Sequence, residues 1–213
     1  MEFCARTLIN SKALGEPHFL DEQQLIGFDA QIPHNVPEMD HVVSASDEKE
    51  IRTEIVRMVR RACDQGLMMS TYGTASVRWR GNDFLITRTD ITRWNIGLDD
   101  IVQIRDGKRE PGKVPSRAMW LHHEIYKMNP HVNAIIMTQP PYLMAFGATH
   151  EHMDVKTIPE SWIFLQDMPN LPFGSQFAGK NDIPEMISNK TAAVLVNNDA
   201  VIVTGKTLLQ AFD

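Results

Sequence analysis

Cysteine and long apolar runs are scarce in this sequence, and so is any excess of positive charge. Its two cysteines, Cys4 and Cys63, lie far apart and lack the close spacing of a metal motif. Together with twelve methionines and no signal-like opening segment, this predicts a protein of the reducing cytoplasm. The most apolar stretch, residues 132–148, is interrupted by polar residues and by Pro140-Pro141, so the sequence predicts no membrane span.

Basic residues are outnumbered by acidic ones. The 213 residues include 21 lysines and arginines against 27 aspartates and glutamates, a formal net charge of −6, and the two signs are interspersed. A nucleic-acid-binding face requires clustered basic residues. We therefore expect no nucleic-acid or membrane partner, and small molecules or proteins instead. Hydrophobic residues make up 43% of the chain, which is enough for one substantial core.

Hydrophobic periodicity predicts an α/β protein. Apolar residues at helical spacing predict helices at residues 2–11, 21–28, 46–66, 119–128, 142–147 and 207–212. Short or alternating apolar runs between turn residues predict strands at residues 75–80, 84–87, 101–104, 133–137, 191–196 and 201–203. The first three strands should form an antiparallel meander. Residues 29–46, which are rich in Pro, His, Asn and Asp, read as a surface linker, so the sequence predicts an α/β sheet covered by helices.

Several short motifs follow one another between residues 66 and 206. They are GLMMSTYGTASVR at 66–78, FLIT at 84–87, Pro115-Ser116 before a helix, VNAII at 132–136, Thr138 with Pro141-Tyr142, and the segments 169–173 and 193–206. The ordered set is far more specific than any one of them. In this order, and over residues 47–213, the sequence resembles the class II aldolase/adducin family, which includes fuculose-phosphate aldolase and ribulose-phosphate 4-epimerase.

The resemblance implies a three-layer α/β/α fold with a mostly antiparallel central sheet and helices on both faces. It also implies zinc chemistry, in which three histidines hold an ion that acts as a Lewis acid on a sugar carbonyl. Here the histidine positions align with Met137, Gln139 and Asp199, a poor set of zinc ligands. The catalytic glutamate position aligns with Ala118. We therefore expect no metal ligand, no catalytic residue and no resident cofactor of the family type.

The same resemblance points to an anion site. Four positions that contact phosphate in relatives keep hydroxyl or backbone donors here: Thr71, Gly73, Thr89 and Ser116. At neighbouring positions Thr74, Asp90 and Arg117 replace asparagine, glycine and serine. Arg117, with Arg88, could bind an anion, whereas Asp90 would repel one if it points inward. Retained anion binding and ordinary turn residues with solvated arginines both remain open.

The histidines elsewhere in the sequence fit structural roles better than catalytic ones. His122 and His123 lie on the helix predicted at 119–128, where packing or capping is favoured. The His150-Glu151-His152 pattern falls in a polar loop and reads as a surface pair. His34 and His41, in the linker, have no stronger reading.

The two ends of the sequence suggest a tandem arrangement. Relatives continue the helix that begins near Lys206 into a further stretch, whereas this sequence stops at Asp213. The segments 2–9 and 13–17 resemble that further stretch. The sequence is then a piece of a tandem protein cut between repeats, or its N-terminal helix replaces the C-terminal one and packs beside the 207–212 helix or a neighbour's. A chance likeness of amphipathic helices is the third alternative.

Three functions follow from these observations. The leading hypothesis is an aldolase-like domain that has lost its zinc ligands and acid/base, and serves as a scaffold or as a sugar-phosphate or anion-binding domain. The first alternative is a divergent sugar-phosphate aldolase or epimerase with a rebuilt site that uses Asp199, Glu160 or His123; convergence of Asp199, Gln139 and a histidine would favour it. The second is an inert repeat of a larger protein. By the resemblance alone, we expect a homo-oligomer, and the rings of four that relatives form suggest a tetramer. The linker composition and the resemblance together divide the chain into residues 1–46, a helical segment with a linker, and residues 47–213, an aldolase/adducin-like domain.

Overall fold

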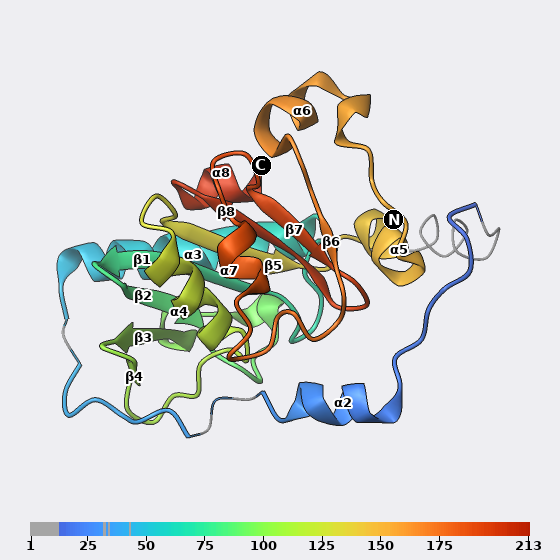
Figure 1. The fold of residues 1–213 in the computed structure, drawn as a ribbon. Helices are drawn as coiled ribbons and strands as arrows, with labels where there is room; N and C mark the ends of the chain where they lie inside the picture. The colour runs from blue at the N-terminus through green and yellow to red at the C-terminus, as the bar shows by residue number, and fades with distance from the viewer. Residues whose placement is uncertain (1–12, 32, 34, 43) are drawn as a thin grey trace.

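One sheet of eight strands organises the part of the chain that the structure describes (Figure 1). This computed structural model describes residues 13–31, 33, 35–42 and 44–213. The strands lie in the order β4-β3-β2-β1-β5-β8-β7-β6. Their bounds are β1 Thr74–Arg80, β2 Asp83–Thr87, β3 Ile101–Arg105, β4 Lys108–Arg109, β5 Ala134–Thr138, β6 Asn170–Leu171, β7 Ala193–Val196 and β8 Ala200–Gly205. Every neighbouring pair is antiparallel except β6 and β7, so the predicted mostly antiparallel sheet and its opening meander are confirmed.

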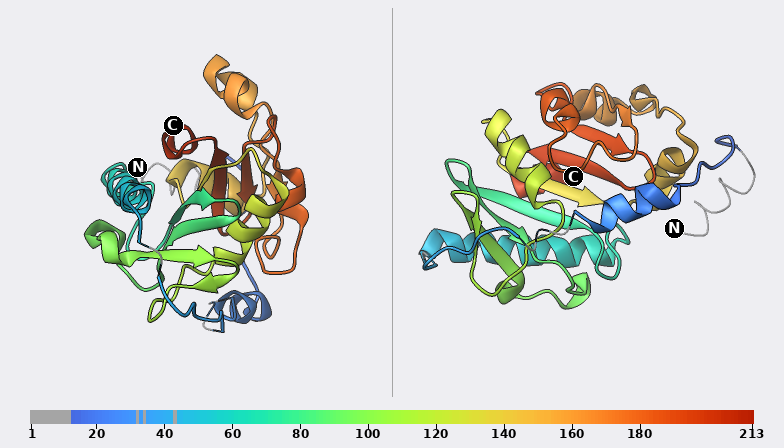
Figure 2. Two further views of the ribbon diagram at one scale, coloured as in Figure 1. Left: turned by 90° about the vertical axis from the view of Figure 1, so that its left-hand side faces the viewer. Right: turned by 60° about the horizontal axis from the view of Figure 1, so that its bottom comes forward.

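Helices cover both faces of this sheet (Figure 2). Their bounds are α2 Glu22–Asp29, α3 Ser46–Asp64, α4 Met119–Met128, α5 Pro141–Thr149, α6 Pro159–Leu165, α7 Asp182–Met186 and α8 Leu208–Phe212. Successive residues of a strand point to opposite faces. Leu85 of β2 joins a buried cluster with α3 and α8, whereas Phe84 and Ile86 join another with α4 and α7. The three-layer arrangement that the resemblance implies is therefore confirmed.

The helix α3 packs an apolar stripe against the sheet. Ile55, Val59 and Ala62, spaced four and three residues apart, are at most 1% exposed. Each large aliphatic side chain buried in this way contributes roughly 1.5–3 kcal/mol relative to exposure. The helix ends at Asp64, close to the predicted Gly66, whose φ of 70° suits the residue after a helix end. Among the described residues, no helix is long and apolar enough to cross a membrane.

The remaining predicted elements of the described region are present, with ends displaced by no more than two residues in most cases. The sequence did not predict α6, α7, β4 or β6, which are short. Pro159 begins α6 and Pro184 lies in the first turn of α7, where a helix tolerates proline, and both helices are too short to show a clear period in the sequence. The helix predicted at 2–11 lies outside the described residues. The expectation that it packs beside α8 therefore stays a prediction.

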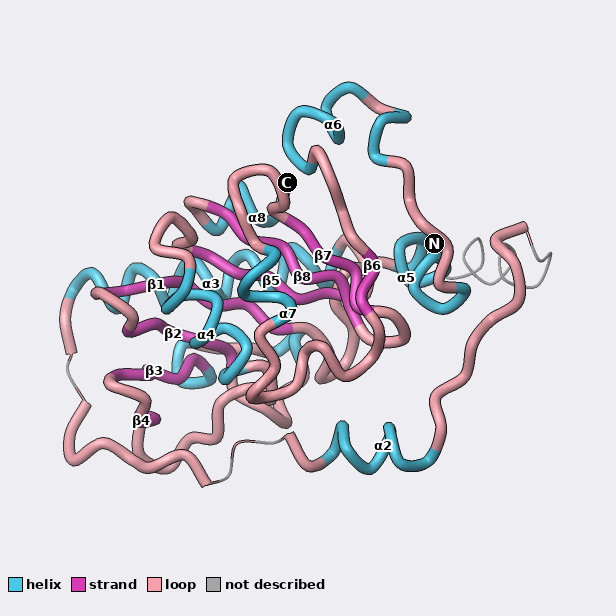
Figure 3. Tube along the Cα trace, viewed as in Figure 1, coloured by secondary structure: helices cyan, strands magenta, loops and turns pink. Residues whose placement is uncertain are grey.

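The segment before α3 runs alongside the sheet (Figure 3). Its helix α2 begins with a capping box, in which the Asp21 side chain accepts from the Gln24 N–H at 2.8 Å and the Gln24 side chain accepts from the Asp21 N–H at 2.9 Å. Further along, Arg109 of β4 donates its N–H to the Pro37 carbonyl at 2.9 Å, and Val36 is buried in the core. The predicted surface linker thus also closes one edge of the sheet.

Candidate functional site

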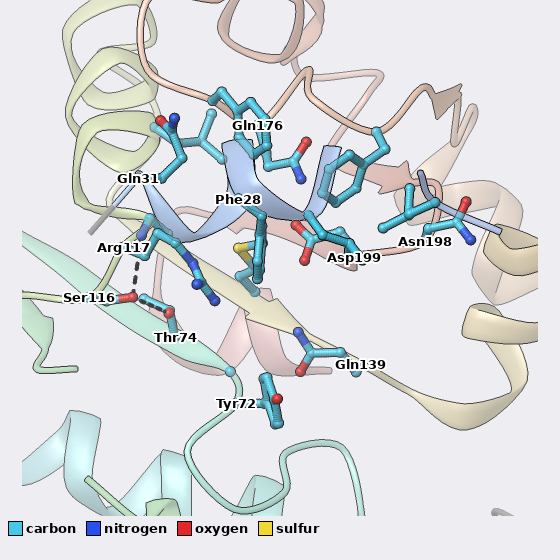
Figure 4. A pocket seen from close by; sticks show the side chains of 18 of the residues that line it. Phe28, Gln31, Tyr72, Thr74, Ser116, Arg117, Gln139, Gln176, Asn198 and Asp199 are labelled. Atoms are coloured by element: carbon cyan, nitrogen blue, oxygen red, sulfur yellow. Dashed lines mark hydrogen bonds between the residues drawn. The ribbon is translucent and has the colours of Figure 1, made fainter. Parts of the chain in front are cut away.

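A cavity of about 380 Å³ lies where the start of β1 and the end of β5 meet the start of α4 and the turn between β7 and β8 (Figure 4). Its wall includes Gly73 and Thr74 at β1, the 116–118 segment before α4, Met137 and Gln139 at β5, Asn198 and Asp199 in the turn, and Leu20, Leu25, Phe28 and Gln31 from the N-terminal segment. Ligand pockets of proteins commonly measure roughly 300–1,000 Å³. The cavity is therefore large enough for a small molecule.

The positions that the family resemblance assigns to metal and catalysis meet in this cavity. Met137 lies in β5 and Gln139 directly follows its end, and both line the cavity. The pairing of β5 with β8, with Thr138 opposite Val201, brings the turn that carries Asp199 beside them. Ala118 completes the group from the position just before α4. One pocket therefore holds all four residues.

The donor set in this pocket does not fit zinc. Zinc sites of proteins use thiolate, imidazole and carboxylate ligands. Met137 offers a thioether and Gln139 an amide, which leaves Asp199 as the single anionic donor of the three. Among the described residues, no group of three or more His, Cys, Asp or Glu side chains is arranged to hold a metal ion.

Asp199 carries the titratable carboxyl of the pocket. It lies in the three-residue turn between Val196 and Ala200, where Asn198 adopts a φ of 60°. Its Oδ2 atom is buried, and the Gln176 side chain lies beside the carboxyl. Burial raises the pKa of Asp199 to about 6, although Arg117 and Gln176 nearby act to lower it. A carboxyl that titrates this close to neutral pH can hold or release a proton in the pocket.

Arg117 faces Asp199 across an aromatic ring. Its guanidinium carbon lies 3.5 Å from the centre of the Phe28 ring, a cation–π contact. Figure 4 shows Arg117 on one side of Phe28, and Asp199 and Gln139 on the other. The cavity therefore has a cationic end and an end with acceptor groups.

The predicted anion-binding residues separate into two groups. Gly73, Ser116 and Arg117 line the cavity, whereas Thr71 and Thr89 do not. The Ser116 hydroxyl lies 2.6 Å from that of Thr74, one of the replaced positions. The Thr89 hydroxyl instead donates to Asp90 at 3.4 Å, outside the cavity lining. The structure thus brings together Gly73, Ser116 and Arg117, which are part of the expected anion site.

Arg93 connects the loop that contains Gly73 to the segment that follows β2. Its Nε donates to the Gly73 carbonyl at 2.8 Å, and its Nη1 donates to the Arg88 carbonyl at 3.0 Å. Burial lowers the pKa of Arg93 to about 10, which still leaves it charged at neutral pH. Nothing in the periodicity of the sequence distinguishes Arg93 from other arginines, and the sequence analysis missed it.

The described histidines lie outside the cavity. His122 is fully buried, its Nδ1 is 2.7 Å from the Ser76 hydroxyl, and burial lowers its pKa to about 3. His123 packs against Phe84 and Trp120. The remaining predicted residues are on the surface: His41, His152 and Glu160 are exposed, while His34 is outside the described residues. Among the described residues, no histidine joins Asp199 and Gln139 in the cavity lining.

One histidine has an unexpected role near the cavity. His150 stacks on His18, with ring centres 4.1 Å apart, and its Nε2 lies 2.8 Å from the Oδ1 of Asn198. Asn198 in turn donates to the His18 carbonyl at 2.7 Å. This cluster attaches the N-terminal segment to the turn that carries Asp199. The sequence contained no signal for it, because His18 is more than a hundred residues away from both His150 and Asn198.

Comparison with known proteins agrees with the fold. The family described as Class II Aldolase and Adducin N-terminal domain matches residues 53–213. The chain is 29% identical to an L-fuculose phosphate aldolase of Methanococcus vannielii over 161 residues, 75% of this chain and 86% of the relative. It is 27% identical to a 3-oxo-tetronate 4-phosphate decarboxylase of Haemophilus influenzae, over 75% of this chain and 79% of the relative.

A solved structure shares the fold. The crystal structure of L-fuculose-1-phosphate aldolase from Thermus thermophilus superposes with a TM-score of 0.65 at 20% identity, and the match covers 76% of this chain and 86% of that one. At this identity, the likeness concerns the fold. Since the family match covers most of the chain, the protein belongs to the class II aldolase and adducin N-terminal domain family.

Proposed function

We propose that this chain is an aldolase-like domain that lacks zinc-dependent aldolase activity and binds a small anion at Arg117. The observation that supports the proposal is the joint character of the four residues that meet in the cavity. Ala118 has no acid/base group, and Met137 and Gln139 are poor zinc ligands. Aldol cleavage of the family type needs a metal ion as electrophile and a glutamate as proton-transfer group. These four residues include neither a histidine set for the metal nor the glutamate.

Anion binding rests on the cationic end of the cavity. Arg117 lies two positions before α4, whose N-terminus favours negative charge, and Ser116 and Gly73 line the same cavity. Relatives whose names include sugar phosphates match over most of the chain. A domain of this kind could sense a ligand or serve as a scaffold.

The proposal is tested by a cleavage assay of the wild type and by zinc binding of a variant that carries the family's metal and catalytic residues. Wild-type protein supplied with zinc should not cleave L-fuculose 1-phosphate above background. The fourfold variant Ala118→Glu, Met137→His, Gln139→His, Asp199→His should gain tight zinc binding, since it restores the ligand types that zinc prefers. Zinc-dependent cleavage by the wild type would refute the proposal.

A second function is favoured by the titration of Asp199. A carboxyl with a pKa of about 6 in a pocket is a suitable general base, and Arg117 could stabilise the enolate that forms on proton abstraction. The chain would then be a divergent sugar-phosphate aldolase or epimerase with a rebuilt site. This alternative requires turnover of a sugar phosphate that is lost in Asp199→Asn and is indifferent to a metal chelator.

Three further properties of the protein stay predictions from the sequence. They are the inert repeat of a larger tandem protein, the cytoplasmic location and the homo-oligomer of four subunits. Light scattering coupled to size-exclusion chromatography measures the last of these directly, because a tetramer would have four times the mass of the 24.2 kDa chain.

A further inference from the structure

The N-terminal segment gives the cavity an apolar wall. Leu20, Leu25 and Phe28 line the cavity, and all three precede the residues that match the family, which begin at 53. Phe28 projects from α2 into the cavity, with Arg117 on one side of its ring and Asp199 on the other (Figure 4). The wall therefore lies outside the matched family domain, and its aromatic ring stands beside a residue that the resemblance aligns with the family's metal site.

The chain that follows α2 is firmly attached to the sheet. Val36 and Met39 are at most 8% exposed. The Arg109 N–H of β4 donates to the Pro37 carbonyl at 2.9 Å, and the Met39 N–H donates to the Arg109 carbonyl at 3.0 Å. Segments with buried side chains and paired backbone groups open rarely. This part of the chain is therefore a fixed end for the wall that precedes it.

The wall itself, residues 18–31, is attached more weakly. Phe19, Leu25 and Ile26 are 88%, 52% and 64% exposed, so much of its apolar surface is not buried. An isolated helix of eight residues is unstable in water, and α2 therefore depends on its contacts with the domain. The ring of Phe28 makes the main apolar contact of α2 with the cavity. A segment with so little buried surface opens locally at a small free-energy cost.

The beginning of this wall is held by a small cluster at the surface, which we call the latch: His18, Ala148, His150 and Asn198. His18 donates its N–H to the Ala148 carbonyl at 2.7 Å and stacks on His150, with ring centres 4.1 Å apart. The Asn198 amide donates to the His18 carbonyl at 2.7 Å, and its Oδ1 lies 2.8 Å from His150 Nε2. Hydrogen bonds at an exposed site exchange readily with water, so the latch can break and re-form while the sheet stays folded.

We propose that residues 18–31 are a cover of the cavity that opens at the latch, turns about the fixed end at residues 36–39 and so admits a ligand. In the closed position of this structure, Phe28 takes up space in the cavity. Opening removes this ring and the leucines of the wall from the cavity. The cover regulates access to the anion site, so its purpose rests on the proposed function, whereas its opening does not depend on which ligand binds.

Thiol modification inside the cavity tests the cover without a ligand. Ser116→Cys places a thiol in the lining with little change of volume, and the buried Cys63 of α3 is an internal reference for unfolding of the core. N-ethylmaleimide is the reagent, and peptide mass spectrometry follows each site in the whole chain. We expect the thiol at position 116 to react at least about 10-fold more slowly than glutathione, and at least about 10-fold faster than Cys63. Reaction as fast as that of glutathione, or no faster than that of Cys63, would overturn the proposal.

A second substitution in the Ser116→Cys background assigns the opening to the latch. His150→Gly removes the ring stack and the hydrogen bond to Asn198, and glycine suits the φ of 59° at this position. We expect modification at position 116 to become roughly 5-fold faster, as for the loss of one hydrogen bond, while Cys63 keeps its rate. The control is His152→Gly, which changes an exposed histidine of the same loop outside the latch. Equal rates at position 116 in the two variants, or an equal acceleration of Cys63, would show that the latch does not hold the cover.

These outcomes separate the cover from the proposed function. Thiol rates that overturn the cover leave the anion site standing, because they involve no ligand. Zinc-dependent cleavage of L-fuculose 1-phosphate would refute the proposed function without changing the thiol rates expected for the cover.

Discussion

At the scale of single residues, the cavity depends on a glycine and a carboxyl whose surroundings constrain them. Gly73 has a φ of +94°, and a Cβ added there would lie 2.6 Å from the Cγ of Met68. The Gly73 carbonyl is also held by Arg93. No other residue type can take this conformation without strain, so the loop that carries Tyr72 to the cavity requires glycine.

We therefore predict that Gly73→Ala lowers the free energy of unfolding by about 1–3 kcal/mol, since it combines backbone strain with a steric clash. Urea denaturation followed by circular dichroism measures the change. Gly112→Ala is the matched control, because Gly112 has a φ of +74° but an added Cβ would meet no atom within 4 Å. Equal losses in the two variants would show that the clash with Met68 does not matter.

The carboxyl of Asp199 makes stability depend on pH. Its pKa is about 6 in the folded chain, whereas an unfolded aspartate titrates near about 3.9. Between these values the folded state binds a proton that the unfolded state has released, so the free energy of unfolding falls as pH rises and the loss is complete above about pH 6. Below about pH 4 both states are protonated and the effect vanishes.

Asp199→Asn removes this titration. At pH 7.5 we expect the variant to exceed the wild type in free energy of unfolding by up to about 3 kcal/mol, and at pH 4 we expect the difference to become small. Denaturant titrations at the two pH values measure it. A difference of the same size at both would contradict the burial of this carboxyl as its cause.

At the scale of elements, the periodicity of long segments was sufficient to predict α3, α4 and the meander, because a helix of 19 residues and three alternating strands repeat their pattern several times. Elements such as β6, with two residues, contain no repeat from which a period can be read. The helix α2 was predicted, but its place over the cavity was not. That place depends on Phe28 meeting Phe173, a contact between residues far apart in the chain.

The candidate site was predictable where the family resemblance aligned the residues. Ala118, Met137, Gln139 and Asp199 were named together and lie together. Thr71 and Thr89 were named and lie elsewhere, and the wall formed by the N-terminal segment lies outside the matched residues. Spacing along the sequence cannot reveal a contact such as that between His18 and His150.

The cap of α2 provides a prediction for this element. Asp21→Ala removes the hydrogen bond to the Gln24 N–H and should destabilise the helix by about 1 kcal/mol. Hydrogen exchange should therefore become roughly 5-fold faster in residues 22–29 and stay unchanged in α4. Glu22→Ala, which removes a carboxylate of the same turn but keeps the cap, is the control. Protection that stays equal in Asp21→Ala and Glu22→Ala would show that the cap does not hold α2 over the cavity.

At the scale of the whole molecule, the sheet carries a core on each face, and the cavity lies at the end of one of them. On the α4 face, the Ser76 hydroxyl lies 2.7 Å from both His122 Nδ1 and the Tyr126 hydroxyl, which fixes α4 against β1. The residues just before α4, from Ser116 to Ala118, are thereby held at the cavity. The fold therefore brings Ala118, Met137, Gln139 and Asp199, the positions that the resemblance aligns with the family site, into one cavity.

The central proposal is that this cavity holds no catalytic metal. Elemental mass spectrometry of purified protein tests it, after incubation with zinc, manganese or cobalt and exhaustive desalting. We predict far less than one ion per chain, because Met137 and Gln139 replace ligand types that these ions prefer. A content near one ion per chain, lost in Asp199→Ala, would contradict the account and identify the chain as a metalloenzyme with a rebuilt site.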